Sequence, residues 1–65
     1  MKIMVNGEAQ QMQGRTLADL LIELGHGDAK LATAVNEDFV PAVARADCVL
    51  EPGDRVEILS ARQGG

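Results

Sequence analysis

The chain has 65 residues and a formal net charge of −4, and 46% of its residues are apolar. A chain of this length forms one domain and buries only about 60% of the surface that its unfolded form exposes, so its local signals must agree with one another. The acidic excess lies in residues 33–65, which carry three basic and six acidic residues. It argues against nucleic acid or an anionic membrane as a partner, because both favour clustered Lys and Arg.

The first predicted element is a β-hairpin. Residues 2–6 alternate in polarity, which places Ile3 and Val5 on one face and Met4 on the other. The Asn-Gly pair that follows is typical of a tight two-residue turn. Residues 8–13, which read EAQQMQ, then form a polar second strand at an edge of the sheet. The apolar stretch at the start is too short for a signal peptide or a membrane span.

A helix is predicted after the hairpin. Thr16 is a good N-cap, and Asp19 stands three residues later, as in a capping box. Leucines then recur at i, i+3, i+4 and i+7 and form one apolar stripe, and Gly25 is placed to end the helix. About nine helical residues are marginal alone in water, so we expect the stripe to pack on the apolar face of the hairpin.

Three further strands are predicted, at residues 31–36, 39–41 and 55–61. Pro41 ends the second of these or confines it to an edge. Residues 42–50 favour one helical turn followed by irregular chain. The order β-β-α-β-β-β predicts an α+β fold in which a small mixed sheet packs on one main helix. Residues 1–61 form the domain, and residues 62–65 form a flexible tail that ends in Gly-Gly.

This order and the closing diglycine resemble the ubiquitin-like β-grasp family. The segments AVNEDFVP (34–41), PGDRVEILSA (52–61) and QGG (63–65) are similar to its ThiS branch, the sulfur carriers of thiamine biosynthesis. The resemblance covers the whole chain. The AVN..FVP pattern separates this branch from the MoaD carriers of molybdopterin synthesis, which are usually longer. ThiS relatives often carry Arg directly after the Pro, where this chain has Ala42.

The resemblance implies a cytoplasmic protein cosubstrate that is not itself an enzyme and binds no cofactor. A ThiF-like adenylyltransferase would use ATP to adenylate the carboxylate of Gly65. Sulfur from cysteine, delivered by a cysteine desulfurase or a sulfurtransferase, would then convert that carboxylate to a thiocarboxylate. A ThiG-like thiazole synthase would take the sulfur into the thiazole ring.

The tail composition suits this chemistry. Gly64 and Gly65 have no Cβ, so their backbone can pass close to the walls of a narrow tunnel and adopt φ values that other residues resist. Arg62 and Gln63 can hold the tail extended through polar contacts in a partner's groove. A frayed terminus with no role is the plain alternative for such a tail.

Strand alternation predicts a docking patch on the face of the sheet away from the helix. Neighbours on a strand face opposite sides, so if Val40 and Ile58 face the helix, Phe39 and Leu59 face solvent together with Met4. These three would lie on adjacent strands and form an apolar surface for a partner. Scattered exposed apolar side chains are also common in proteins that bind nothing there.

Two acidic residues lie close to this patch in the sequence. Glu57 and Asp54 can rim the patch and steer a partner that has a basic groove. An ordinary solvated strand and turn explain the same two residues equally well.

Cys48 and His26 are poor candidates for catalysis. A catalytic thiol needs a base or a positive charge that lowers its pKa, and nothing in the sequence pairs these two residues. We therefore expect Cys48 to be a buried or half-buried small apolar residue and His26 to be a solvated loop residue. One Cys and one His do not complete a closed metal site. A single Cys also excludes an internal disulfide and fits the reducing cytoplasm.

Four functions remain open from the sequence. The protein is a sulfur carrier, of ThiS type or of the rival MoaD type, or it is a ubiquitin-like modifier that is joined to lysines through Gly65. A plain interaction module would have an inert tail, and a stand-alone enzyme would show turnover by itself. Thiocarboxylate formation favours a carrier, and high-mass conjugates favour a modifier.

Overall fold

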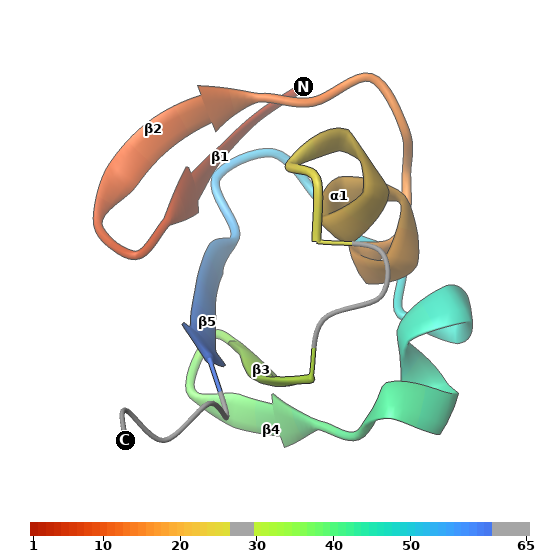
Figure 1. Ribbon diagram of the computed structural model, residues 1–65. Coiled ribbons are helices and arrows are strands. Elements are labelled where there is room, and N and C mark those ends of the chain that lie inside the picture. Colours follow the sequence, from red (N-terminus) through yellow and green to blue (C-terminus); the bar gives the residue numbers. More distant parts are fainter. Residues whose placement is uncertain (27–29, 61–65) are drawn as a thin grey trace.

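The computed structural model describes residues 1–26 and 30–60, and their strands form one five-stranded sheet in the order β2-β1-β5-β3-β4 (Figure 1). The elements are β1 (Lys2–Val5), β2 (Glu8–Gln11), α1 (Leu17–Glu23), β3 (Leu31–Val35), β4 (Asp38–Val40), the 3₁₀ helix η1 (Ala42–Asp47) and β5 (Arg55–Ser60). β1 and β5 run parallel, and the other neighbouring strands are antiparallel. The sheet is therefore mixed and curves around one α-helix, which confirms the predicted α+β class and the predicted order of strands and main helix along the chain.

Each of the two hairpins, β1–β2 and β3–β4, has a tight turn. Asn6 and Gly7 have φ values of 50° and 86°, and Asn36 and Glu37 have 51° and 76°. Positive φ at both central residues is the conformation that matches the right-handed twist of the flanking strands. The first turn confirms the prediction from Asn-Gly. In the second turn the chain reverses over residues 36–37, so β4 already begins at Asp38.

The capping box predicted for α1 is present. Thr16 Oγ1 accepts a hydrogen bond from the Asp19 amide at 3.1 Å, and Asp19 Oδ2 accepts from the amides of Thr16 at 3.2 Å and Arg15 at 2.9 Å. The helix ends at Glu23, with Leu24 as its C-cap and Gly25 at φ 84°. Its seven residues are fewer than the nine expected, so its stability depends all the more on packing.

The core lies between α1 and one face of the sheet. Its buried apolar side chains are Ile3, Val5, Met12, Leu17, Leu20, Leu21, Val40, Leu50, Val56 and Ile58. Three of them come from the leucine stripe of α1, and Ile3, Val5, Val40, Val56 and Ile58 come from the strands, as the alternation predicted. Among the described residues, no helix is both long enough and apolar enough to cross a membrane.

One buried polar residue links η1 to the sheet. The hydroxyl of Thr33, which is 1% exposed, donates to the Val40 carbonyl at 2.8 Å and accepts from Arg45 Nε at 3.0 Å. Arg45 Nη2 also donates to the Leu31 carbonyl at 2.7 Å. η1 is longer than the single helical turn expected. Hydrogen bonds from the side chain of Arg45 hold this helix against β3.

The capping box makes stability depend on pH. The backbone amides of Arg15 and Thr16 lower the pKa of Asp19 below its ordinary value. A lowered folded-state pKa contributes stability above the unfolded value of roughly 4, and this contribution is lost as the pH falls through the lower folded value. In urea denaturation, Asp19→Asn should therefore be less stable than the wild type at neutral pH and lose less stability on acidification. Asp38→Asn, which removes an exposed carboxylate from β4, is the control, and equal pH slopes for Asp19→Asn and the wild type would contradict this role.

Candidate functional site

The face of the sheet away from α1 carries the candidate docking residues, and we call it the open face. It includes Met4 from β1, Ala32 and Ala34 from β3, Phe39 from β4, and Arg55, Glu57 and Leu59 from β5, which alternate with the residues of the core face. Phe39 and Leu59 are each 67% exposed, whereas their neighbours Val40 and Ile58 are buried. The predicted assignment of the two faces is therefore confirmed.

The register of the strands sets the spacing between Phe39 and Leu59. Ala34 pairs with Phe39 on one side and with Glu57 on the other, and Ala32 pairs with Leu59. β3 therefore separates β4 from β5, and the prediction that the patch residues lie on adjacent strands is wrong for Phe39. The intervening side chains are only methyl groups, so the two larger side chains flank a low strip of alanines.

Met4 lies apart from this pair. It is half-buried and pairs with Arg55 at the start of β5. Leu59 is four residues further along the strand, which corresponds to roughly 13 Å at 3.3 Å per residue. The apolar part of the open face is thus centred on Phe39 and Leu59, with Met4 towards the opposite end of β5.

The acidic residues near the patch have different environments. Glu57 is exposed and lies in the same cross-strand row as Phe39, so it is within the open face and not at its rim. Asp54 instead stabilises its own turn, because Oδ2 accepts from the Glu51 amide at 2.8 Å and Oδ1 accepts from Asn36 Nδ2 at 3.1 Å. These turn contacts are enough to explain Asp54, and Glu57 remains the candidate for steering a partner.

The predicted tail follows directly after the open face. Arg62, Gln63, Gly64 and Gly65 lie outside the described residues, as does the predicted domain boundary at residue 61. The last described residue, Ser60, ends β5 and pairs with Leu31 of β3. Leu59 is thus one residue from the end of the described strand and three positions before Arg62 in the sequence.

Cys48 has the environment of a structural thiol. It is half-buried and packs against the core. Burial, and to a lesser extent the charge of Asp54, raises the pKa of the thiol, which is opposite to the shift that a nucleophilic thiolate needs. His26 is half-buried after α1, where its amide donates to the Leu21 carbonyl at 2.8 Å. In the part of the chain that the structure describes, no group of three or more His, Cys, Asp or Glu is placed to hold a metal ion.

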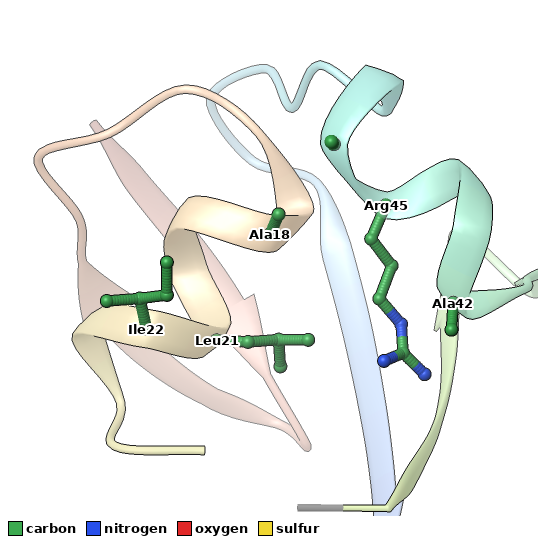
Figure 2. A pocket seen from close by; sticks show the side chains of 6 residues that line it. Ala18, Leu21, Ile22, Ala42 and Arg45 are labelled. Atoms are coloured by element: carbon green, nitrogen blue, oxygen red, sulfur yellow. The ribbon is translucent and has the colours of Figure 1, made fainter. Parts of the chain in front are cut away.

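A groove of about 210 Å³ lies between α1 and η1, and sequence reasoning missed it (Figure 2). It is lined by Ala18, Leu21, Ile22, Ala42, Arg45 and Ala46. The guanidinium of Arg45 extends from η1 along this groove and is held by Thr33 and the Leu31 carbonyl. Ordinary alternation and helix periodicity gave no signal for it, because the groove exists only once residues 42–47 form a second helical element.

Comparisons with known proteins agree on one family. The ThiS family model matches residues 3–65. The sulfur carrier protein ThiS of Thermus thermophilus is 33% identical over 63 residues, which cover 97% of this chain and 98% of that protein. The sulfur carrier protein ThiS of Escherichia coli is 32% identical over 66 residues and is covered completely, as is this chain.

A solved structure and a longer protein add to this. The crystal structure of a thiamine biosynthesis protein (ThiS) from Geobacter metallireducens superposes with a TM-score of 0.83 at 26% identity, covering 100% of both chains. A thiazole synthase of Paramagnetospirillum magneticum is 35% identical over 66 residues, which cover all of this chain but 20% of that protein. A segment like this chain therefore forms about one fifth of a larger protein.

The two faces of β4 predict losses of stability of different size for the same substitution. Phe39→Asp should change the free energy of unfolding by less than about 1 kcal/mol, because the side chain is mostly exposed. Val40→Asp is the matched variant one residue away and should cost about 3 kcal/mol or more, because it places a carboxylate in the core. Chemical denaturation measures both, and equal losses would mean that the face assignment is wrong.

Proposed function

The chain belongs to the ThiS family and is a sulfur carrier protein of thiamine biosynthesis, and we propose that the carboxylate of Gly65 is the group that carries the sulfur. The observation that carries this proposal is the family match through residue 65, which includes the two glycines of the tail. The relatives from Thermus thermophilus and Escherichia coli are covered over 98% and 100% of their lengths, so the similarity is to whole carrier proteins.

The chemistry of the tail follows from the reactivity of a carboxylate. A carboxylate is a poor electrophile, so one of its oxygens first attacks the α-phosphorus of ATP, which releases pyrophosphate and leaves an acyl adenylate. The terminal sulfur of a persulfide on the sulfur-supplying enzyme then attacks the acyl carbon and displaces AMP, which leaves an acyl disulfide between the tail and that enzyme. A thiol attacks the enzyme's sulfur atom in this disulfide, so that the S–S bond breaks, the thiol and the enzyme form a new disulfide, and the electron pair leaves with the thiocarboxylate. Gly64 and Gly65 have no Cβ, so the tail can enter a narrow site.

Three kinds of partner follow from these steps. A ThiF-like adenylyltransferase binds ATP and activates the tail, a cysteine desulfurase or sulfurtransferase supplies the sulfur, and a ThiG-like thiazole synthase accepts it. The thiazole synthase that contains a segment similar to this whole chain supports the last of these. A carrier segment within such a protein is consistent with a short path between carrier and acceptor.

The open face is the proposed docking surface for these enzymes. Phe39 and Leu59 are large, apolar and 67% exposed, and Leu59 lies three positions before the first residue of the predicted tail. A partner that covers the alanines between them can therefore bind the sheet and receive the tail at the same time. The net charge of −4 favours a partner with a basic surface. On the open face itself, the exposed side chains of Glu57 and Arg55 carry opposite charges.

The tail proposal predicts a defined change of mass. Incubation with ATP, a sulfur donor and the ThiF-like adenylyltransferase should increase the intact mass by the difference between sulfur and oxygen, and fragmentation should map the change to Gly65. Gly65→Ala should block loading, because the added methyl group would not fit in a narrow site. It should leave the midpoint of unfolding unchanged, because residue 65 belongs to the predicted tail. Gln13→Ala, an exposed substitution before α1, is the control.

Three outcomes separate the alternatives. Normal loading of Gly65→Ala would disprove the close fit, and an unchanged wild-type mass with an active adenylyltransferase would disprove the proposed role of Gly65. High-mass conjugates on lysines would indicate a modifier in place of a carrier.

The docking proposal predicts a loss of affinity without a loss of stability. Phe39→Asp should raise the Kd for the ThiG-like thiazole synthase about tenfold or more, as expected for an aromatic side chain at the centre of an interface. Val43→Asp is the matched control, because Val43 is 90% exposed but belongs to η1 and not to the open face. Calorimetry measures both, and equal weakening by the two variants would refute the location of the surface.

A further inference from the structure

We propose that Asn6 is a positioning residue, whose side-chain amide holds the last part of β5 in line and thereby aims the tail at the active site of the adenylyltransferase. The inference rests on the proposed function of Gly65. It concerns a residue that belongs neither to the tail nor to the candidate docking pair, and that acts through the backbone of β5.

The contacts of Asn6 replace a missing stretch of strand. Its Oδ1 accepts from the Ile58 amide at 2.8 Å, and its Nδ2 donates to the Ile58 carbonyl at 3.1 Å. Its own backbone amide donates to the Val56 carbonyl at 2.9 Å. A primary amide carries one carbonyl and one N–H donor group, so the side chain satisfies both backbone groups of Ile58 as a neighbouring strand would.

The topology explains why this replacement is needed. β1 pairs with β5 only at Met4↔Arg55 and Val5↔Val56, because the chain then turns towards β2. β5 continues to Ser60, and β3 covers its other edge up to the pair Leu31↔Ser60. Without the Asn6 amide, the backbone N–H and C=O of Ile58 would both lose these partners, although the residue lies two positions before the end of the strand.

The same residue also has to form the turn. Asn6 has φ 50°, a left-handed conformation that Gly and Asn tolerate better than other residues. Glycine at this position would preserve the turn and delete only the side-chain amide. Asn6→Gly therefore separates the contact with Ile58 from the backbone conformation of the hairpin.

Asn36 provides a matched control at the opposite end of the same strand. It has φ 51°, its amide donates to the Arg55 carbonyl at 2.7 Å, and its Oδ1 accepts from the Arg55 amide at 3.0 Å. Its Nδ2 also donates to Asp54 Oδ1 at 3.1 Å. Both asparagines thus lie in left-handed turns and hold β5 through their side chains, but only Asn6 acts near the tail.

The test is the adenylation reaction of Asn6→Gly and Asn36→Gly, followed as pyrophosphate release with ATP and the ThiF-like adenylyltransferase. A misplaced reactive group lowers the turnover of a bound complex, so kcat for Asn6→Gly should fall about tenfold, within the range up to about a hundredfold that a small misplacement costs. KM should change less than about twofold, because the contacts at the open face, which bind the ground state and the transition state equally, are retained. Asn36→Gly should leave both constants within about twofold of the wild type.

Amide hydrogen exchange provides an independent measurement on the free protein. The Ile58 amide should exchange faster in Asn6→Gly, and the Arg55 amide should exchange faster in Asn36→Gly. Unchanged exchange at Ile58, an unchanged kcat for Asn6→Gly, or equal losses of kcat in the two variants would overturn the proposal. Absence of pyrophosphate release with the wild-type chain would instead overturn the function proposed for Gly65, on which this inference depends.

Discussion

The fold depends on the insertion of its last strand into the middle of the sheet. β5 lies between β1 and β3, so without it the sheet separates into two hairpins, each of which is marginal alone in water. Its inward side chains, Val56 and Ile58, are 1% and 8% exposed and complete the core under α1. The residues that close the fold are therefore those that directly precede the tail.

A second constraint comes from the polar contacts at the edge of the core. Thr33 is buried on the central part of the sheet, where an unpaired hydroxyl would be costly. It is satisfied by one donated and one accepted hydrogen bond, to Val40 and from Arg45. The same guanidinium fixes η1, a short element that its own backbone would hold only weakly. The Arg45 guanidinium therefore both completes the hydrogen bonding of this hydroxyl and holds residues 42–47 beside α1, where the groove lies.

Local signals in the sequence predicted most of the framework. The Asn-Gly turn, the capping box and the alternation in β4 and β5 each depend on residues within a few positions of one another, so they could be read directly. Residues 42–47 could not, because η1 exposes Val43 and is held by a contact from Arg45 to Thr33, which is 12 residues away. Likewise, only the order of the strands in the sheet could show that β3 separates Phe39 from Leu59.

The longest of these contacts could not be predicted from local patterns at all. Asn6 was identified as a turn residue, which it is, but its bonds to Ile58 span 52 positions in the sequence. The pattern Asn-Gly specifies a conformation and carries no information about what the side chain reaches. Such a signal emerges only when the parallel pairing of β1 and β5 is known, because that pairing places the turn beside the second half of β5.

Successive residues of β5 belong alternately to the open face and to the core. Ile58 is fixed from the side of β1 by Asn6 and packs into the core, whereas Leu59 is exposed on the proposed docking surface. Because successive side chains on a strand alternate, a one-residue shift of β5 would bury Leu59 and expose Ile58. The register that stabilises the core therefore also sets which residues of β5 lie on the proposed docking surface. In this sulfur carrier, the packing of the core and the composition of the open face are thus fixed by one and the same strand pairing.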